Sequence, residues 1–380
     1  DVFALGGTQI DLPPCNCKEI TLFRDACSGG DVTVVPPSGT LINGVHSTYV
    51  LEESRIAMTL KCRQQDGQWY IVSKHVEPAL AQAVFEVDNA TNTSVTIVTS
   101  TGQPYTVDWG DGNVDSNVPS GTAANHAYAT PFTGLVSVSV LCGIDPVTQM
   151  TVSGRFSFDI NRLNQFPNLT HFVGGGDNIT TGDIANLPTG LTYYENVGSN
   201  TTSGDIANLP TGLTLYSNQG YNTTSGDIAN LPTGLTVYSN GGSNTTTGDI
   251  ATLPTGLTYY ENVGSNTTTG DIANLPTGLT LYLNTGSNTT TGDIANLPTG
   301  LTYYVNQGSN TTSGDIANLP TGLTYYQNRG SNTTTGDIAN LPTGLTLYLN
   351  QGSNTTTGDI ANLPTGLTYY QNRGSNTTTG

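Results

Sequence analysis

The sequence predicts a mainly β protein, in which two small β-sandwich-type domains precede a solenoid of short parallel strands. From Gly182 to Gly380 the chain repeats one unit of 22 residues without insertion or deletion. Such a period is typical of a solenoid, because each unit buries its apolar face by stacking on the next. Residues 1–153 instead alternate short apolar runs with turns rich in Gly and Pro, which indicates small sandwiches.

Composition narrows the classes of function. Charged residues make up 10 % of the chain and the net charge is −18, which suits a secreted or particle-borne β protein and argues against nucleic-acid binding. No apolar run reaches 18 residues, so we expect no membrane insertion. The chain begins at Asp1 without a visible signal peptide, and we expect a processed or preceding segment.

Residues 1–78 form the first expected domain. The order Ile20-Thr-Leu-Phe-Arg, Asp31-Val-Thr-Val-Val-Pro-Pro-Ser-Gly-Thr, Ile42-Asn-Gly, Tyr49-Val-Leu and Gln68-Trp-Tyr-Ile-Val resembles a small β module of bacteriophage fibre and tailspike proteins, over about residues 18–72. The resemblance implies a homo-oligomer, with a trimer as the expected form, and contacts with other virion or surface proteins. An unrelated small β-sandwich is the alternative.

The five cysteines are Cys15, Cys17, Cys27, Cys62 and Cys142. An oxidising setting favours a disulfide between two of the first four, with Cys142 as a buried free thiol. Zinc is the sharper alternative, but one residue separates the first two thiols where zinc sites usually have two to four. We therefore expect no metal in this region.

Residues 79–153 form the second expected domain. Tyr105-Thr-Val-Asp-Trp-Gly-Asp-Gly, then His126-Ala-Tyr-Ala-Thr-Pro-Phe-Thr-Gly, then Leu135-Val-Ser-Val-Ser-Val resemble a polycystic-kidney-disease (PKD) type immunoglobulin-like domain over about residues 80–153. The resemblance implies a sandwich that acts as a spacer, with Trp109 and Tyr128 in its core. Asp108, Asp111 and Asp115 suggest turn carboxylates rather than calcium ligands, because the closing Glu of a calcium loop is missing.

Residues 154–181 indicate a degenerate capping rung, which aligns with the first repeat but is one residue shorter. Nine repeats follow over residues 182–380, and we expect the polypeptide to continue beyond Gly380. Comparison of the copies separates two faces of a short strand. Tyr194, Asn196 and the later Asn200 recur in every copy and are expected to point inward as a structural ladder.

The alternate positions of this strand vary between copies, so we expect them to face solvent and to be the candidate binding residues. The candidate outward residues are Tyr193, Glu195, Val197, Tyr259, Tyr303, Tyr325, Gln327, Arg329, Tyr369, Gln371 and Arg373. Asp205 precedes Ile-Ala-Asn-Leu-Pro and is expected to cap a single helical turn. A calcium ladder is the alternative role for this aspartate, and we otherwise expect no cofactor.

The repeats resemble a leucine-rich repeat over about residues 155–380, because Leu191-x-x-Tyr194-x-Asn196 stands where that family has Leu-x-x-Leu-x-Leu. The resemblance implies a solenoid of short parallel strands. In two departures from the family, Asn196 replaces the third leucine and the ladder asparagine Asn200 falls one residue late. These departures question an ordinary horseshoe curvature and leave a straighter rod as the alternative.

The repeated rungs argue against an enzyme, because a catalytic site differs from its surroundings and the four histidines are scattered along the chain. The leading hypothesis is a virion fibre or spike, most simply of a bacteriophage, that attaches to a host cell-surface glycan or protein. A bacterial cell-surface adhesin is the runner-up, and an ice-binding solenoid with rows of Thr201-Thr-Ser hydroxyls is the third. All three predict a location on a virion, on a cell surface or outside the cell.

Overall fold

The computed structural model describes residues 2–4, 9–14, 19–24, 32–51, 56–63, 66, 68–76, 82–140 and 146–380. The chain divides into two compact units. One comprises residues 1–84, 97–124 and 135–147, and the other comprises residues 85–96, 125–134 and 148–380. The molecule is mainly β, with small sheets near its N-terminus and a solenoid of parallel strands after them. The segment 79–153, expected to be one domain, contributes residues to both units.

The first unit begins with two small sheets, in the orders β1-β3-β6-β7 and β2-β4-β5. Their strands are Val2–Ala4 (β1), Gln9–Asp11 (β2), Glu19–Arg24 (β3), Val32–Val35 (β4), Tyr49–Leu51 (β5), Ile56–Arg63 (β6) and Gln68–Val76 (β7). Alternation along the strands buries one face of each sheet. Leu22, Met58 and Trp69 are fully buried in the resulting core.

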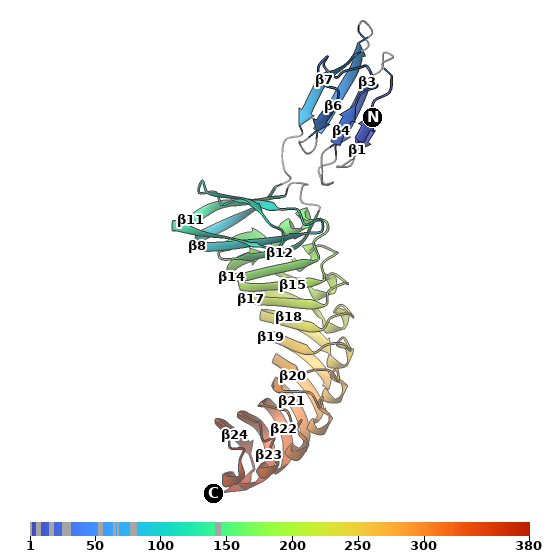
Figure 1. Ribbon diagram of the computed structural model, residues 1–380. Helices are drawn as coiled ribbons and strands as arrows, with labels where there is room; N and C mark the ends of the chain where they lie inside the picture. Colours follow the sequence, from blue (N-terminus) through green and yellow to red (C-terminus); the bar gives the residue numbers. More distant parts are fainter. Residues whose placement is uncertain are drawn as a thin grey trace. The chain divides into compact units, whose positions relative to one another are not determined.

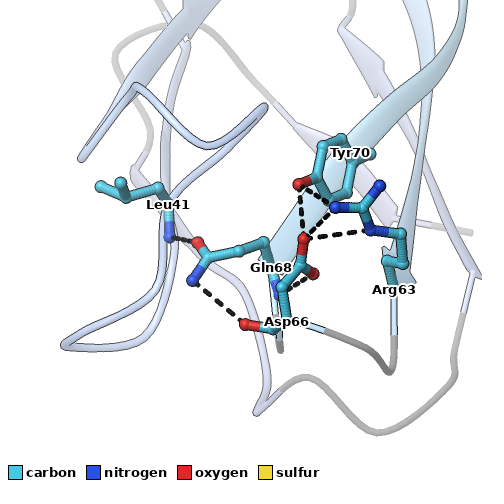
Figure 2. A network of polar contacts seen from close by, with 5 residues as sticks. All are labelled: Leu41, Arg63, Asp66, Gln68 and Tyr70. Atoms are coloured by element: carbon cyan, nitrogen blue, oxygen red, sulfur yellow. Dashed lines mark hydrogen bonds and ion pairs between the residues drawn. The ribbon is translucent and has the colours of Figure 1, made fainter.

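A polar network fixes the end of the β6–β7 hairpin (Figure 2). The Oδ2 atom of Asp66 accepts hydrogen bonds from Arg63 Nε at 3.0 Å and from Tyr70 Oη at 2.7 Å. The arginine above all, and then the tyrosine, lower the pKa of Asp66 to about 2. Gln68 Oε1 accepts from the backbone N–H of Leu41, which joins the hairpin to an earlier loop. Every charge in this network is paired, which is typical of a structural role.

The segment 82–140 supplies four strands, of which β8 and β11 contribute residues to both units. The bounds are Gln82–Thr99 (β8), Tyr105–Asp108 (β9), Val114–Val118 (β10) and Ala123–Val140 (β11). Strand β9 pairs antiparallel with β10 and with the end of β11. Within the first unit Trp109 is fully buried, and its Nε1 donates to Asp115 Oδ2 at 3.0 Å.

The second unit continues with a rung that precedes the repeats. Its elements are Val147–Ser153 (β12), Phe156–Asp159 (β13), the 3-10 turn Ile160–Gln165 (η1) and His171–Thr181 (β14). Strand β14 pairs in parallel with β12, with β13 and with the first repeat strand. Phe172 therefore lies beside Tyr194, with ring centroids 5.7 Å apart.

The repeat strands all run parallel. They are Tyr193–Asn200 (β15), Ser203–Asp205 (β16), Leu215–Asp227 (β17), Val237–Asp249 (β18), Tyr259–Asp271 (β19), Leu281–Asp293 (β20), Tyr303–Asp315 (β21), Tyr325–Asp337 (β22), Leu347–Asp359 (β23), Tyr369–Gly374 (β24) and Thr377–Thr379 (β25). The 3-10 turns are Ile184–Asn186 (η2), Ile206–Asn208 (η3), Ile228–Asn230 (η4), Ile250–Thr252 (η5), Ile272–Asn274 (η6), Ile294–Asn296 (η7), Ile316–Asn318 (η8), Ile338–Asn340 (η9) and Ile360–Asn362 (η10).

Each long repeat strand has two parts that pair in different registers. In the first part a residue pairs with its equivalent in the next rung, as Tyr238 does with Tyr260. In the second part the pairing moves by two residues, so that Thr247 lies beside Thr267. Gly264, with φ +153°, stands at this shift, where a Cβ would come within 2.5 Å of a backbone oxygen of the previous rung. Only glycine fits both constraints.

The rungs of the second unit follow an arc, with their short turns on its convex side (Figure 1). The stack of rungs is therefore curved and not a straight rod. In the second repeat the apolar interior consists of Ile206, Leu209, Leu213 and Tyr216, each no more than 4 % exposed. The strand and the turn thus both contribute to one continuous core, as stacking of identical units requires.

Candidate binding surface

One asparagine of each rung is at the centre of a buried hydrogen-bond network. Asn222 is wholly buried, and its Oδ1 accepts from the N and Oγ1 atoms of Thr202 at 3.1 and 2.8 Å. Its Nδ2 donates to the carbonyl oxygens of Asn218 and Gly241 at 3.0 and 3.2 Å. These contacts join three successive rungs. Asn200, which the sequence places in the ladder, makes the equivalent contacts one rung earlier.

The recurring tyrosine and the other recurring asparagine lie on the same interior face. Tyr194 is fully buried, and its ring stacks on Tyr216 with centroids 5.7 Å apart. Asn196 Nδ2 donates to Tyr194 Oη at 3.0 Å and to Thr180 Oγ1 at 2.6 Å. Burial raises the pKa of Tyr194 well above its usual value, so its hydroxyl stays neutral. Within the described part of the chain Asn196 Oδ1 has no hydrogen-bond partner, and the same holds for its counterparts through Asn350.

Asp205 lies at the start of the 3-10 turn η3, where its Oδ1 accepts from the N–H of Ala207 at 2.9 Å. A Cβ on Gly226 of the next rung would lie 2.1 Å from that oxygen. The carboxylate is therefore held between its own turn and the following glycine. Among the residues that the structure describes, no three His, Cys, Asp or Glu side chains gather as metal ligands would.

The outward positions form a surface that we call the outer strip, defined by Tyr193, Glu195, Val197 and their copies in later rungs. Tyr193 and Glu195 are partly exposed, and Val197 is 39 % exposed. Tyr193 Oη donates to Glu195 Oε2 at 2.7 Å. That bond, together with partial burial, raises the pKa of Tyr193 to about 12. The strip therefore begins with a carboxylate whose direction is set by a tyrosine.

A second carboxylate links three rungs of the outer strip. Glu261 Oε2 accepts from Tyr259 Oη at 2.9 Å and from Ser239 Oγ at 2.7 Å. It also accepts from Gln219 Nε2 at 3.3 Å. Partial burial and this carboxylate raise the pKa of Tyr259 to about 12. Polar side chains of three rungs thus donate hydrogen bonds to the one carboxylate of Glu261.

Aromatic and basic side chains occupy the strip farther along the stack. Tyr303 and Tyr325 stack with centroids 4.3 Å apart and an interplanar angle of 17°. Tyr325 Oη donates to Gln327 Oε1 at 3.2 Å, and Arg329 is exposed. In the last rung Tyr369 is 46 % exposed.

The final side chains of the strip bond to one another. In the orientation that satisfies its amide, Gln371 donates to Tyr369 Oη at 3.0 Å. Its oxygen then accepts from Arg373 Nε at 2.8 Å. The two carboxylates of the strip lie in the first and fourth repeats and the two arginines in the seventh and ninth, so the strip differs in charge along its length.

The expectation of a solvated face is wrong for the middle position of several rungs. Ser239, Val305, Gln327 and Leu349 are only 4–7 % exposed. Equivalent residues lie side by side because the strands pair in register, as Gln327 does with Leu349, so neighbouring side chains cover one another. The accessible surface therefore comes mainly from the first and last positions of each strand.

A different face of the solenoid carries rows of hydroxyl groups. In the rung of β18, Thr245 and Thr247 are exposed while Thr246 between them is buried. The same alternation recurs from β19 to β23. Lateral pairing of Thr247 with Thr267 sets the rows of successive rungs beside each other. The sequence-based idea of a regular hydroxyl array thus has a geometric counterpart.

The other candidates have structural contacts. Asp108 Oδ1 accepts from Gly110 N at 2.9 Å, and Asp111 Oδ1 accepts from Asn113 N at 3.0 Å, as turn carboxylates do. Cys62 is disulfide-bonded. The other cysteines, Cys15, Cys17, Cys27 and Cys142, lie outside the described residues. The expectations of a zinc site and of a free thiol at Cys142 concern these residues and stay predictions. No helix in the described ranges is long and apolar enough to cross a membrane.

Comparisons with known proteins give structural likeness alone. No family model matches the chain, and no curated protein matches it. The solved structure of the plant peptide hormone receptor RGFR1 in complex with RGF2 is 22 % identical over 58 % of this chain and 42 % of its own, with a TM-score of 0.41. The Arabidopsis receptor kinase HAESA, in complex with the peptide hormone IDA and the co-receptor SERK1, is 19 % identical over 59 % of this chain and 52 % of its own, with a TM-score of 0.37.

This chain thus spans about half the length of those two receptor chains or less. The solenoid itself is established by the parallel, in-register pairing of its own rungs.

Proposed function

We propose that this chain is a structural and adhesive fibre whose repeated shaft attaches to a host surface, carried most simply on a virus particle such as a bacteriophage. In this proposal the fibre-like module of residues 18–72 joins the chain to other virion proteins as a homo-oligomer, expected to be a trimer. The PKD-like segment is a spacer. A bacterial cell-surface adhesin of the same architecture is the alternative.

The observation that carries the proposal is the contrast between the interior and the outer strip. Tyr194, Asn196 and their copies are identical in all repeats, whereas the strip alternates among aromatic, aliphatic, acidic, amide and basic residues. Stability requires the first set, but nothing in the core requires the second. The strip is therefore the part of the shaft that would distinguish one partner from another.

A ligand that meets this strip would be extended and would bind by many weak contacts. Half-exposed tyrosine rings, carboxylates and amides are the groups that contact sugars and polar protein chains. Successive rungs raise the effective concentration of each following contact, so overall affinity should rise steeply with rung number. A host glycan is the partner this chemistry favours, and a surface protein is the second.

Rung deletion tests the proposal in the full chain. Removing residues 248–313 takes out three repeats, and removing residues 226–335 takes out five. Both deletions leave a Thr–Gly or Ser–Gly junction like every natural one. Retention would be measured on purified bacterial surface polysaccharides and on isolated cell envelopes. We expect retention to fall roughly tenfold or more with each deletion.

A variant with all its repeats separates a binding role of the shaft from a role as a spacer. Tyr193→Ser, Tyr259→Ser and Tyr369→Ser, combined in one variant, remove rings from accessible positions and should also weaken retention. Equal retention of all variants would show that the shaft is only a spacer. Failure of every polysaccharide and envelope to retain the full chain would remove the adhesive role.

The hydroxyl rows favour ice binding as a second candidate function. Exposed threonines such as Thr245 and Thr247 repeat on one sheet face at the spacing of parallel strands. Inhibition of ice recrystallisation by the full chain would support this function. Activity that survives Thr→Lys replacement along those rows, or no activity in the intact chain, would exclude it.

A further inference from the structure

A cavity of about 360 Å³ lies in the second unit, apart from the outer strip. Its walls come from β8, from β11 and from the end of β12, three segments far apart in the sequence. Six polar side chains line it: Asn92, Thr93, Ser94, Asn125, His126 and Ser153. The volume is at the low end of the range of about 300–1,000 Å³ that small-molecule sites occupy.

The cavity is built on a backbone that only glycine permits. Gly154 has φ +119°, and a Cβ there would lie 2.5 Å from the carbonyl oxygen of Asn92. The main chain after β12 therefore lies directly against β8. On the β11 side, His126 meets Tyr128 edge-on with centroids 4.5 Å apart, and Tyr128 stacks on Phe132 at 4.8 Å. The imidazole thus packs against a ring that is itself stacked.

The lining offers hydrogen bonds but no formal charge. Among the described residues that line the cavity there is no Asp, Glu, Lys or Arg. Arg155 follows directly, but its Nε donates to the Asp88 carbonyl at 2.7 Å and its Nη2 lies 3.5 Å from Asp88 Oδ2. A phosphate or carboxylate would thus find no counter-charge in the lining. An apolar ligand would leave amides and hydroxyls desolvated, which is costly.

We propose that this cavity binds a neutral saccharide, one or two sugar rings in size. Sugar hydroxyls both donate and accept, and they therefore match a lining that mixes amides, hydroxyls and an imidazole. Thr93 is 4 % exposed, and within the described part of the chain its Oγ1 has no hydrogen-bond partner. This site is separate from the outer strip and does not rest on the adhesive proposal.

Saturation-transfer NMR on the full chain provides the test. The probes are glucose, galactose, mannose and N-acetylglucosamine, with glucose 6-phosphate and N-acetylneuraminic acid as charged comparators. We expect transfer to at least one neutral sugar and much less to its charged comparator. Ala127→Trp places a large ring at an exposed residue that lines the cavity, and should weaken binding about tenfold or more.

Ala129→Trp is the matched control, because Ala129 is exposed on the same strand but is not among the lining residues. It should bind as the unmodified chain does. No transfer to any neutral sugar, equal transfer to charged sugars, or normal binding by Ala127→Trp would each overturn the proposal. Rung deletions leave this site intact, so its failure is distinguishable from that of the shaft.

Discussion

Asn262 and Asn266, two asparagines of one rung on strand β19, are equally buried but unequally bonded. Asn266 Oδ1 accepts from the N and Oγ1 atoms of Thr246 at 3.0 and 2.8 Å, and its Nδ2 donates to the Thr285 carbonyl at 3.2 Å. Asn262 Nδ2 donates to Thr246 Oγ1 at 2.7 Å and to Tyr260 Oη at 3.1 Å. Within the described residues, however, Asn262 Oδ1 accepts nothing. Leucine at each site therefore removes different interactions.

Asn266→Leu removes three hydrogen bonds: it leaves the buried N–H of Thr246 without a partner, takes the acceptor from the buried hydroxyl of Thr246, and takes a donor from the partly buried carbonyl of Thr285. A buried donor left without an acceptor costs about 1–3 kcal/mol, and two such donors result, so we expect a loss of about 3 kcal/mol or more in the free energy of unfolding. Asn262→Leu takes the donor from the buried Tyr260 hydroxyl, but it also removes an unpartnered acceptor, and Thr246 Oγ1 can still donate to Asn266. One buried hydroxyl costs about 1–3 kcal/mol, so we expect this change to cost less than Asn266→Leu does.

Urea unfolding of the full chain, followed by circular dichroism, measures both changes. Asn244→Leu and Asn240→Leu repeat the comparison one rung earlier, where the contacts are equivalent. Because stacked repeats can unfold in segments, hydrogen exchange in the neighbouring rungs should accompany the urea experiment. Equal losses at the two asparagines, or a greater loss at Asn262, would refute the assignment of the network.

Two further predictions concern tyrosines. Tyr216→Ala should cost roughly 3 kcal/mol or more because the ring is fully buried, whereas Gln219→Ala should cost about 0.5–1.5 kcal/mol through its lost bond to Ser239; similar urea midpoints for the two would contradict this. The second prediction concerns alkaline pH. The folded-state pKa is raised to about 12 at Tyr193 and Tyr259 and lies well above its usual value at the buried Tyr194. These tyrosines therefore stabilise the folded state fully below pH 10, and the stabilisation is lost as the pH rises through 12. Tyrosinate absorbance from the buried tyrosines should therefore appear together with loss of circular dichroism. Ionisation of all 19 tyrosines in a folded chain would be inconsistent with the buried stack.

Much of a rung can be predicted from the sequence because the copies act as an internal comparison. Identity at Tyr194 and Asn196 indicates the interior, and Asp205 before an apolar turn indicates a cap. Variation is a less certain guide to exposure. Gln327 varies between copies yet is 7 % exposed, because in-register neighbours cover a side chain whatever its type.

The register of the strands and the polar cavity could not be predicted by comparing the repeats. The period of 22 residues does not reveal that the second part of each strand pairs two residues out of step, although the recurring glycine equivalent to Gly264 marks the place. The polar cavity was not predicted either. Its lining residues, such as Asn92, Asn125 and Ser153, come from segments that meet only in three dimensions.

The rung before the repeats gives the stack its starting point. Phe172 lies against Tyr194 but carries no hydroxyl, and Gly174 pairs with Asn196 where later rungs have an asparagine. Each later interface is almost the same as the next, so a misfolded chain that skips one whole rung would lose little packing. We expect growth from this distinctive interface, N-terminal first as the chain is synthesised, to disfavour such slipped states. The order of synthesis thereby supplies the positional information that the repeated sequence lacks.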